Sequence, residues 1–535
     1  MSDPAFLSAD QARRFVADGF IVIQSGLQLP THARIDTELP ELFRGQGTLA
    51  LADNVLPSVP SLNQILEAPA VRGAVASVLG PDFAWAPHRF PHNSEPTPQT
   101  EPIDAFADQP EMGAGSISGS GWHQDGHYRG GRCRWQTFRA ANVFYFPRDT
   151  PIEMGPTRLL AGSHLYANLN CAQRAQAVFR PLPAGTVIVA DFDLGHAGSP
   201  NRTDKARYMV KFVALRTNGR QAMEGAGEWQ TPVGLASVDD TPNAWRSIWN
   251  WQRGASRHHG IDPASNMNGT IAALGSADAH ARLESIYRLS ATEAAVRPLL
   301  AALRGTAGQG RHESQDPGSA AYRSRGPDPA ERRFSFHQFV PEDATVALAA
   351  MGEPALTALV ELTEDDDPWM RMNAAWALGD GSLTGQTVHA ALSRLLADGD
   401  VNVVRVTLDA LCANPVFGEA TVRQIAMLLQ SERPEWCVPA PAEPRVGTTW
   451  RARDQVRFLC AWALTNRATL GDPPPELERA LTNALADDTD YVPAVACEGL
   501  GRVGTASALR AAFAYLQRRR WDTTGRQLER LNTSP

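Results

Sequence analysis

The chain has 535 residues, a formal net charge of −8 and 43% hydrophobic residues. This length predicts three or four domains of about 150 residues, or one catalytic domain followed by a repeat array. The acidic balance argues against a nucleic-acid or membrane-surface partner, and no apolar run approaches the roughly 20 residues of a membrane span. Six scattered cysteines without a CxxC pair, and a start without signal-peptide features, predict a cytoplasmic protein with reduced thiols.

The first part of the chain, up to about residue 216, alternates short β-type runs with turn signals. Ser8 and Gln11 form a capping-box pattern that predicts a helix start. Strands are predicted around 142–146 and 186–190. A tryptophan-containing helix is expected over 243–253, with its indole rings in the core.

Chemistry is concentrated in residues 121–128, which contain His123 and Asp125. Side chains two positions apart lie on the same side of an extended strand, so both can reach one metal ion. A third ligand, His196, comes 73 residues later, which fits several intervening strands of a small barrel. Two histidines and one carboxylate on one face are typical of non-haem Fe(II) oxygenases. The spacing alone leaves surface hydrogen-bonding groups as an equal alternative.

Arg207 follows His196 by eleven residues and is expected on the next strand. A guanidinium in that position can bind the far carboxylate of a dicarboxylic keto acid with two hydrogen bonds.

Four segments resemble the phytanoyl-CoA dioxygenase (PhyH) family of Fe(II)/2-oxoglutarate oxygenases. They are the HxD run at 123–128, the Gly-Ser-His loop at 155–164, the strand and turn over 183–203, and the opening helix and strand over 7–23. The resemblance covers about residues 5–255. It implies a double-stranded β-helix (jelly-roll or cupin-like) domain with flanking helices.

The resemblance also implies roles for individual residues. His123, Asp125 and His196 would bind Fe(II), and Arg207 would bind the C5 carboxylate of 2-oxoglutarate, with O₂ as the second co-substrate. Asn201 would order its turn.

Two positions depart from the family pattern. Gly198 stands where a serine often helps to hold 2-oxoglutarate, and Ser199 follows it. Phe144 stands where a tryptophan forms one wall of the cofactor pocket. A further 2-oxoglutarate contact from an upstream strand cannot be aligned, and His88 and Arg89 are the candidates.

Residues near the HxD run were also considered as substrate contacts. His127 is either a substrate contact or a loop hydrogen-bonding group, and His164 is expected to be structural. Arg129, Arg132 and Arg134 are expected in a solvated loop, with a basic rim for an anionic substrate as the alternative.

The second part of the chain, from about 276 to 520, is rich in Ala and Leu and repeats itself. An acidic helix start, an arginine one turn later, small residues and a leucine recur with a period in the low thirties, apart from a Pro-rich interruption at 434–444. Such a period predicts stacked helix pairs, and the segments resemble short bacterial HEAT-like repeats. The recurring arginines are expected to form ion pairs between repeats.

These patterns predict four regions: an oxygenase domain over 1–255, a linker over 256–340, HEAT-like helical repeats over 341–520 and a tail over 521–535. The linker is expected to contain a degenerate first repeat and a mobile Gly/Arg/Ser-rich insertion.

The predicted function is hydroxylation of an unactivated C–H bond of a small or medium-sized metabolite, with release of succinate and CO₂. The repeats would serve partner docking or dimerisation. Asp125 makes halogenation unlikely, because a carboxylate occupies the position that a halide would need; desaturation and cyclisation stay open. The alternatives are a protein hydroxylase whose repeats present a polypeptide and an inactive oxygenase-derived scaffold, against which the intact triad and Arg207 weigh.

Overall fold

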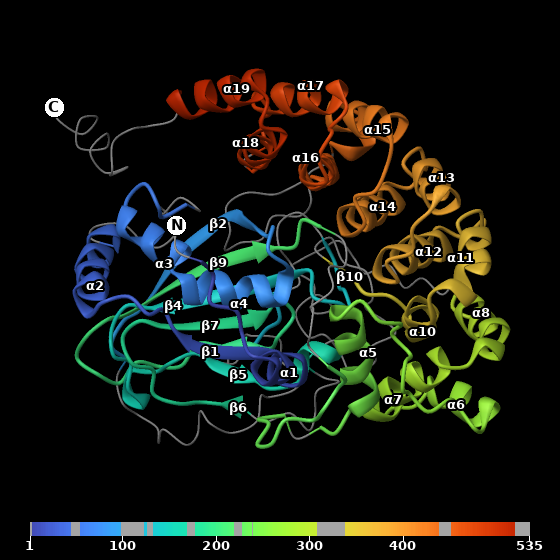
Figure 1. Cartoon of the computed structure of the whole chain (residues 1–535), viewed down its shortest axis with the longest axis horizontal. Helices are drawn as coiled ribbons and strands as arrows, with labels where there is room; N and C mark the ends of the chain where they lie inside the picture. Colours follow the sequence, from blue (N-terminus) through green and yellow to red (C-terminus); the bar gives the residue numbers. More distant parts are fainter. Residues whose placement is uncertain are drawn as a thin grey trace.

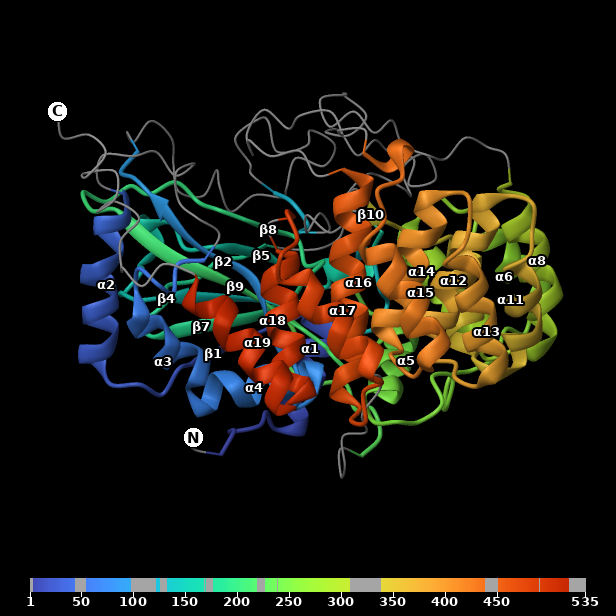
Figure 2. The same cartoon turned by 90° about the horizontal axis from the view of Figure 1, so that it is seen from above.

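The computed structural model describes residues 3–43, 54–97, 122–125, 132–167, 169, 177–218, 227–237, 239–307, 338–437, 451–489 and 491–518. It has two parts. A β-sheet region occupies the first half of the chain, and an arc of helices from the second half curves around one side of it (Figures 1 and 2).

A five-stranded antiparallel sheet forms the centre of the first part, in the order β1-β7-β4-β9-β2. Its strands are β1 (Phe20–Gln24), β2 (Ala84–Ser94), β4 (Ala140–Phe146), β7 (Thr186–Asp191) and β9 (Arg207–Leu215). All residues of β4 and β7 are buried. Central strands of this kind are covered on both faces, which explains why they read as nearly continuous hydrophobic runs.

Helices flank this sheet, as predicted. They are α1 (Ala9–Asp18), α2 (Leu29–Phe43), α3 (Asn63–Glu67), α4 (Pro69–Leu79) and α5 (Pro242–Gln252). The capping box of Ser8 and Gln11 is present at the start of α1. Helix α4 packs across β1, β4, β7 and β9 and covers one face. The predicted tryptophans of α5 are buried.

A second antiparallel sheet, in the order β6-β5-β8, covers the other face. Its strands are β5 (Arg158–Leu160), β6 (Ala177–Val178) and β8 (His196–Ala197). One apolar cluster joins Phe144 and Ile188 of the large sheet to Leu159 of the small one. Two antiparallel sheets packed face to face are the predicted double-stranded β-helix arrangement, and β8 delivers His196 into the space between them.

The second part of the chain is all-helical and forms two layers of helices (Figure 1). The inner layer, next to the β-sheet region, consists of α10 (Asp343–Met351), α12 (Pro368–Asp380), α14 (Val401–Ala413), α16 (Ala452–Thr469) and α18 (Val492–Val503). The outer layer consists of α11 (Leu356–Leu362), α13 (Gln386–Leu395), α15 (Glu419–Leu429), α17 (Pro475–Ala484) and α19 (Ala506–Gln517). Successive inner helices pack on one another, as in a solenoid.

The repeat pattern has the physical basis expected from the sequence. Asp367 and Asp400 cap the N-termini of α12 and α14. Arg371 binds Asp398 of the following repeat with two hydrogen bonds of 2.7 and 2.9 Å, and Arg457 pairs with Asp487 at 3.1 Å. The predicted ion pairs between repeats are therefore confirmed for these two arginines.

Helices α6 (Met267–Ala273), α7 (Ala279–Ser290) and α8 (Val296–Arg304) lie in the stretch predicted as a linker, and α7 and α8 pack against α10. Residues 308–337 of the Gly/Arg/Ser-rich insertion and residues 519–535, which include the predicted tail, lie outside the described residues.

The oxygenase-side segment between residues 132 and 139 joins the two parts. Its β3 (Arg132–Cys133) pairs in parallel with β10 (Gln338–Phe339), which precedes the first inner helix. The Trp135 and Trp376 rings stack with centroids 5.6 Å apart. The concave face of the repeat array is thus packed against the chain's own β-sheet region.

Among the described cysteines, Cys133 and Cys460 are buried and three are half-buried, so fewer are buried than predicted; all five are free thiols. Within the described ranges no single helix is long and apolar enough to cross a membrane. Only the bent pair Asp343–Met351 and Glu353–Leu362, which meet at 117°, together reach such a length and composition.

Candidate active site

The backbone brings His123 and His196 side by side. The two residues form an antiparallel bridge in which each backbone N–H donates to the other's carbonyl at 3.0 Å. This bridge extends the small sheet beyond β8. Because His123 lies in extended backbone, Asp125 projects from the same side two positions later.

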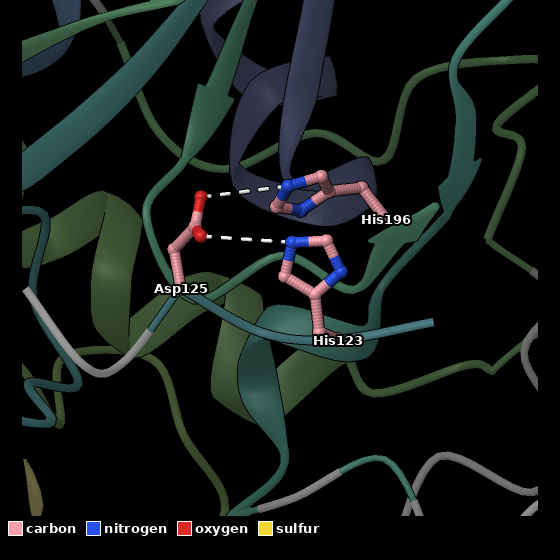
Figure 3. A group of neighbouring side chains, drawn as sticks. All are labelled: His123, Asp125 and His196. Atoms are coloured by element: carbon pink, nitrogen blue, oxygen red, sulfur yellow. Dashed lines mark ion pairs between the residues drawn. The ribbon is translucent and has the colours of Figure 1, made fainter. Parts of the chain in front are cut away.

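The three side chains point toward one another in the space between the sheets (Figure 3). His123 Nε2 lies 3.7 Å from Asp125 Oδ1, and His196 Nε2 lies 3.4 Å from Asp125 Oδ2. One potential ligand atom from each residue lies within 4.8 Å of the others. The side chains of Asp125 and His196 are 10% and 8% exposed, whereas His123 is 37% exposed and marks the open side of the site.

Hydrogen bonding prepares His196 for metal binding. Its Nδ1 lies 3.0 Å from the carbonyl oxygen of Leu194, which is satisfied when Nδ1 carries the proton. Nε2 then presents a lone pair toward Asp125. Burial, together with the neighbouring His123, lowers the pKa of His196 to about 3, so the imidazole is neutral at physiological pH.

Asp125 is held as an anion by two residues that the sequence analysis missed. Asn142 donates to Asp125 Oδ2 at 2.9 Å, and the Lys211 ammonium pairs with the same oxygen. Burial raises the pKa of Asp125, but Lys211, His196 and His123 outweigh it and hold this pKa well below its usual range. Strand periodicity from Arg207 could have identified Lys211, since residues 207, 209 and 211 share one face.

Arg207 has the properties of a binding residue for a missing anion. It starts β9, and its side chain is buried. Its Nε and Nη1 atoms have no hydrogen-bond partner among the residues that the structure describes. Burial lowers its pKa to about 10, which still leaves the guanidinium cationic at neutral pH. A buried cation with unpaired donors fits a carboxylate ligand.

The other predicted cofactor contacts are also buried. The Ser199 hydroxyl is a second buried polar group for which the described residues offer no partner. The Phe144 ring centroid lies 5.2 Å from that of His196. Asn201 orders its turn, as predicted: its Nδ2 donates to the carbonyls of Ser94 and Lys205 at 2.9 and 2.6 Å.

Strand β2 contributes different residues from the two candidates. Arg89 donates to the carbonyl of Ala86 at 3.1 Å, and His88 Nδ1 lies 3.3 Å from the Tyr491 hydroxyl of the repeat region. His92 shares its strand face with His88, and its Nε2 is buried without a partner in the described part of the chain. Burial, followed by the charge of Lys211, lowers the pKa of His92 to about 3.

The arginine prediction was wrong for Arg134, which is fully buried and lies neither in a solvated loop nor on a rim. His127, Arg129 and the Arg132 side chain lie outside the described residues. His164 is structural, since its buried ring contacts the Val16 carbonyl at 3.1 Å.

Comparison with known proteins agrees with this geometry. Residues 18–209 match the profile of the phytanoyl-CoA dioxygenase (PhyH) family, and residues 338–412 match HEAT repeats. The chain therefore contains a PhyH domain, of the non-haem iron and 2-oxoglutarate oxygenase class, followed by HEAT repeats. No curated protein sequence matches the chain.

Similar solved structures include three oxygenase-type proteins. A nickel complex of the non-haem monooxygenase ThoJ is 25% identical, with 43% of this chain and 87% of that chain covered and a TM-score of 0.30. The α-ketoglutarate-dependent carbocyclase SnoK from nogalamycin biosynthesis is 14% identical, with 44% and 91% covered and a TM-score of 0.30. EvdO2 from Micromonospora carbonacea var. aurantiaca, complexed with 2-oxoglutarate, is 18% identical, with 40% and 94% covered and a TM-score of 0.28.

Proposed function

We propose that this protein is an Fe(II)/2-oxoglutarate-dependent dioxygenase that hydroxylates an unactivated C–H bond of a small or medium-sized metabolite and releases succinate and CO₂. The observation that carries this proposal is the convergence of His123, Asp125 and His196 into one buried cluster. The unpaired guanidinium of Arg207 supports it.

In this proposal each residue has a distinct role. His123, Asp125 and His196 hold Fe(II) on one face, which leaves other coordination positions open. Arg207 binds the C5 carboxylate of 2-oxoglutarate, Ser199 donates or accepts a further hydrogen bond, and Phe144 forms a wall. Bound iron and 2-oxoglutarate supply the activation of O₂ for C–H oxidation.

The residues around the cluster prepare it for this chemistry. Asn142 and Lys211 fix one carboxylate oxygen of Asp125 and so orient the other toward the metal. Burial around His196 and Phe144 keeps bulk water from the reacting centre. Asp125 itself supports hydroxylation over halogenation, because its carboxylate fills the position that a halide would need.

The repeats, in the same proposal, serve partner docking or dimerisation through their outer layer. The concave face packs against the chain's own β-sheet region, whereas Met427 of α15 and the nearby Val416 and Leu470 are exposed apolar residues. We also propose a cytoplasmic location, an oxygenase domain over 1–255, a linker over 256–340 and repeats over 341–520.

The test is succinate release by the full-length protein under air, with Fe(II) and 2-oxoglutarate, across a panel of small-molecule substrates. Wild type should release succinate only with Fe(II), and His123→Ala should release none. Arg207→Gln should raise the KM for 2-oxoglutarate by about 100-fold or more, because a buried charge pair contributes roughly 3 kcal/mol. The matched control is Arg202→Gln, on the adjoining turn.

Two results would contradict the proposal. Absence of Fe(II) binding by wild type would favour the inactive scaffold. Turnover of a polypeptide but of no small molecule, abolished by Met427→Glu in the outer layer, would favour the protein hydroxylase. Point variants are used because removal of the repeats would expose Trp135 and its buried neighbours.

A further inference from the structure

We propose that the helical repeats act within their own chain as a scaffold for the metal-binding motif, and that Arg134 is the positioning residue that links them to it. This inference rests on the proposed function of His123, Asp125 and His196. It assigns the concave face of the repeats a role in the reaction centre instead of a role in partner binding.

Arg134 contacts the metal-binding motif directly. Its Nη1 donates to Gln124 Oε1 at 3.0 Å, and Gln124 is the residue between His123 and Asp125. A guanidinium is a rigid planar donor, so it fixes the position of the group it binds more narrowly than an ammonium does. Holding the Gln124 side chain therefore restrains the backbone from which both ligands project.

The same buried network reaches the third ligand. Gln124 Nε2 donates to the carbonyl of Ser163 at 3.4 Å, and Ser163 Oγ accepts the backbone N–H of Gly195 at 2.8 Å. Gly195 immediately precedes His196. Arg134 also donates to the carbonyls of His164 and Ala167, at 3.0 and 2.8 Å, on the two sides of this turn.

The repeats hold the backbone of Arg134 from both sides. Trp376 of inner helix α12 donates its indole N–H to the Arg134 carbonyl at 2.9 Å. The Arg134 N–H donates to the carbonyl of Phe339, in β10, at 2.8 Å. The preceding N–H, of Cys133, donates to the carboxylate of Asp409 in α14.

Asp380, at the end of α12, extends this hold along the segment. It accepts the Gln136 N–H at 3.2 Å and the Thr137 hydroxyl at 3.0 Å, and it pairs with Arg257 at 2.6 Å. Buried polar groups of this kind are costly unless they are satisfied, so their position is tightly specified. A continuous path of hydrogen bonds thus runs from α12 through Arg134 to the residue between two metal ligands.

The test measures metal affinity separately from folding. Co(II) is titrated anaerobically into the full-length protein by calorimetry, for wild type, Arg134→Met, Arg134→Lys and Trp376→Phe. The matched control is Arg371→Gln, which lies on the same helix but pairs with the next repeat. Urea unfolding of each variant gives its stability.

We expect Arg134→Met to weaken Co(II) binding by about 10- to 100-fold, the usual effect of removing an outer-shell partner of metal ligands. Arg134→Lys should recover part of that affinity. Trp376→Phe should weaken binding by several-fold, because it removes one hydrogen bond to the segment and keeps the aromatic packing. Arg371→Gln should lower the unfolding midpoint and leave Co(II) affinity unchanged.

Two outcomes overturn the inference while the proposed function stands. Equal Co(II) affinity in wild type and Arg134→Lys, with none of the repeat variants affecting it, would make Arg134 purely structural. Equal losses in Trp376→Phe and Arg371→Gln would show a general effect of stability. If wild type binds no more Co(II) than His123→Ala does, the proposed function fails and the inference fails with it.

Discussion

The inner and outer helices of the repeat array come from the same repeats but are buried to very different degrees. In inner helix α12, eleven of thirteen residues are buried, whereas in outer helix α13 only four of ten are. The four in α13 lie along one stripe, as in an amphipathic surface helix. Helix α12 is covered on all sides, because the oxygenase segment lies on the face that a partner protein would otherwise occupy.

The difference shows that the inner layer belongs to the protein core and the outer layer to its surface. Polar residues follow the same division. Asp380 is fully buried and paired, while the Arg394–Glu364 pair of the outer layer is 50% and 68% exposed. Substitutions in the two layers should therefore differ in their effect on stability, and several variants can test this.

The largest effect is expected for Asp380→Ala. This change leaves Arg257, whose side chain is 4% exposed, as a buried cation without its carboxylate. Breaking a buried pair from one side typically costs about 3–5 kcal/mol. Urea unfolding should show that loss, and Asp380→Asn, which keeps an acceptor oxygen, should lose less. Equal stability of wild type and Asp380→Ala would mean that the inner layer is not part of the core.

A smaller effect is expected for an added methyl group. A Cβ on Gly379 of α12 would lie 2.9 Å from the Ala410 Cα and 3.0 Å from the Trp135 ring. Overpacking of this kind costs about 1–3 kcal/mol. At the exposed Gly501 of α18 a Cβ would meet nothing within 4 Å, so Gly501→Ala should stabilise by about 0.5–1 kcal/mol.

These two alanine substitutions should therefore change the urea midpoint in opposite directions. The pair serves as its own control, because both replace a helical glycine with the same residue. A gain in stability at Gly379 would contradict the close packing of α12 against the oxygenase segment.

The parts of the site that sequence predicts well are those encoded by short motifs. His123 and Asp125 are two positions apart, and Arg207 is one strand beyond His196, so strand periodicity is enough to bring them together. The repeats are likewise visible as a local period. Lys211 was accessible by the same periodicity from Arg207 but was missed.

The role of Arg134 could not be predicted in this way. Its contact with Trp376 joins residues 242 positions apart, and its contact with Gln124 depends on the turn that this packing imposes. Nothing in the local sequence distinguishes Arg134 from the arginine of a solvated loop. Contacts of this type follow from how the two parts of the chain pack, which periodicity does not specify.

Acid should weaken the buried side of the comparison. Burial lowers the pKa of His164 to about 3, against about 6.5 in an unfolded chain. Above pH 6.5 both states are neutral and stability is unaffected. Below pH 6.5 the unfolded state binds a proton that the folded state does not, so stability falls by about 1.4 kcal/mol per pH unit toward pH 3.

This loss can be assigned with one variant. His164→Asn should have a shallower decline of the urea midpoint between pH 6.5 and 5 than wild type. Above pH 7 the difference between the two proteins should be constant. Identical slopes below pH 6.5 would show that His164 does not remain neutral beneath the segment that carries Arg134.

The smallest effect is expected for Arg394→Ala in the outer layer. Arg394 and Glu364 lie 2.7 Å apart but are largely exposed, and such pairs contribute about 0–1 kcal/mol. The variant should unfold within about 0.5 kcal/mol of wild type, at both 0.15 M and 1 M salt, because water already screens the pair. A loss comparable to that of Asp380→Ala would mean that the outer layer is also buried, through a contact with a second protein or a second copy of this chain.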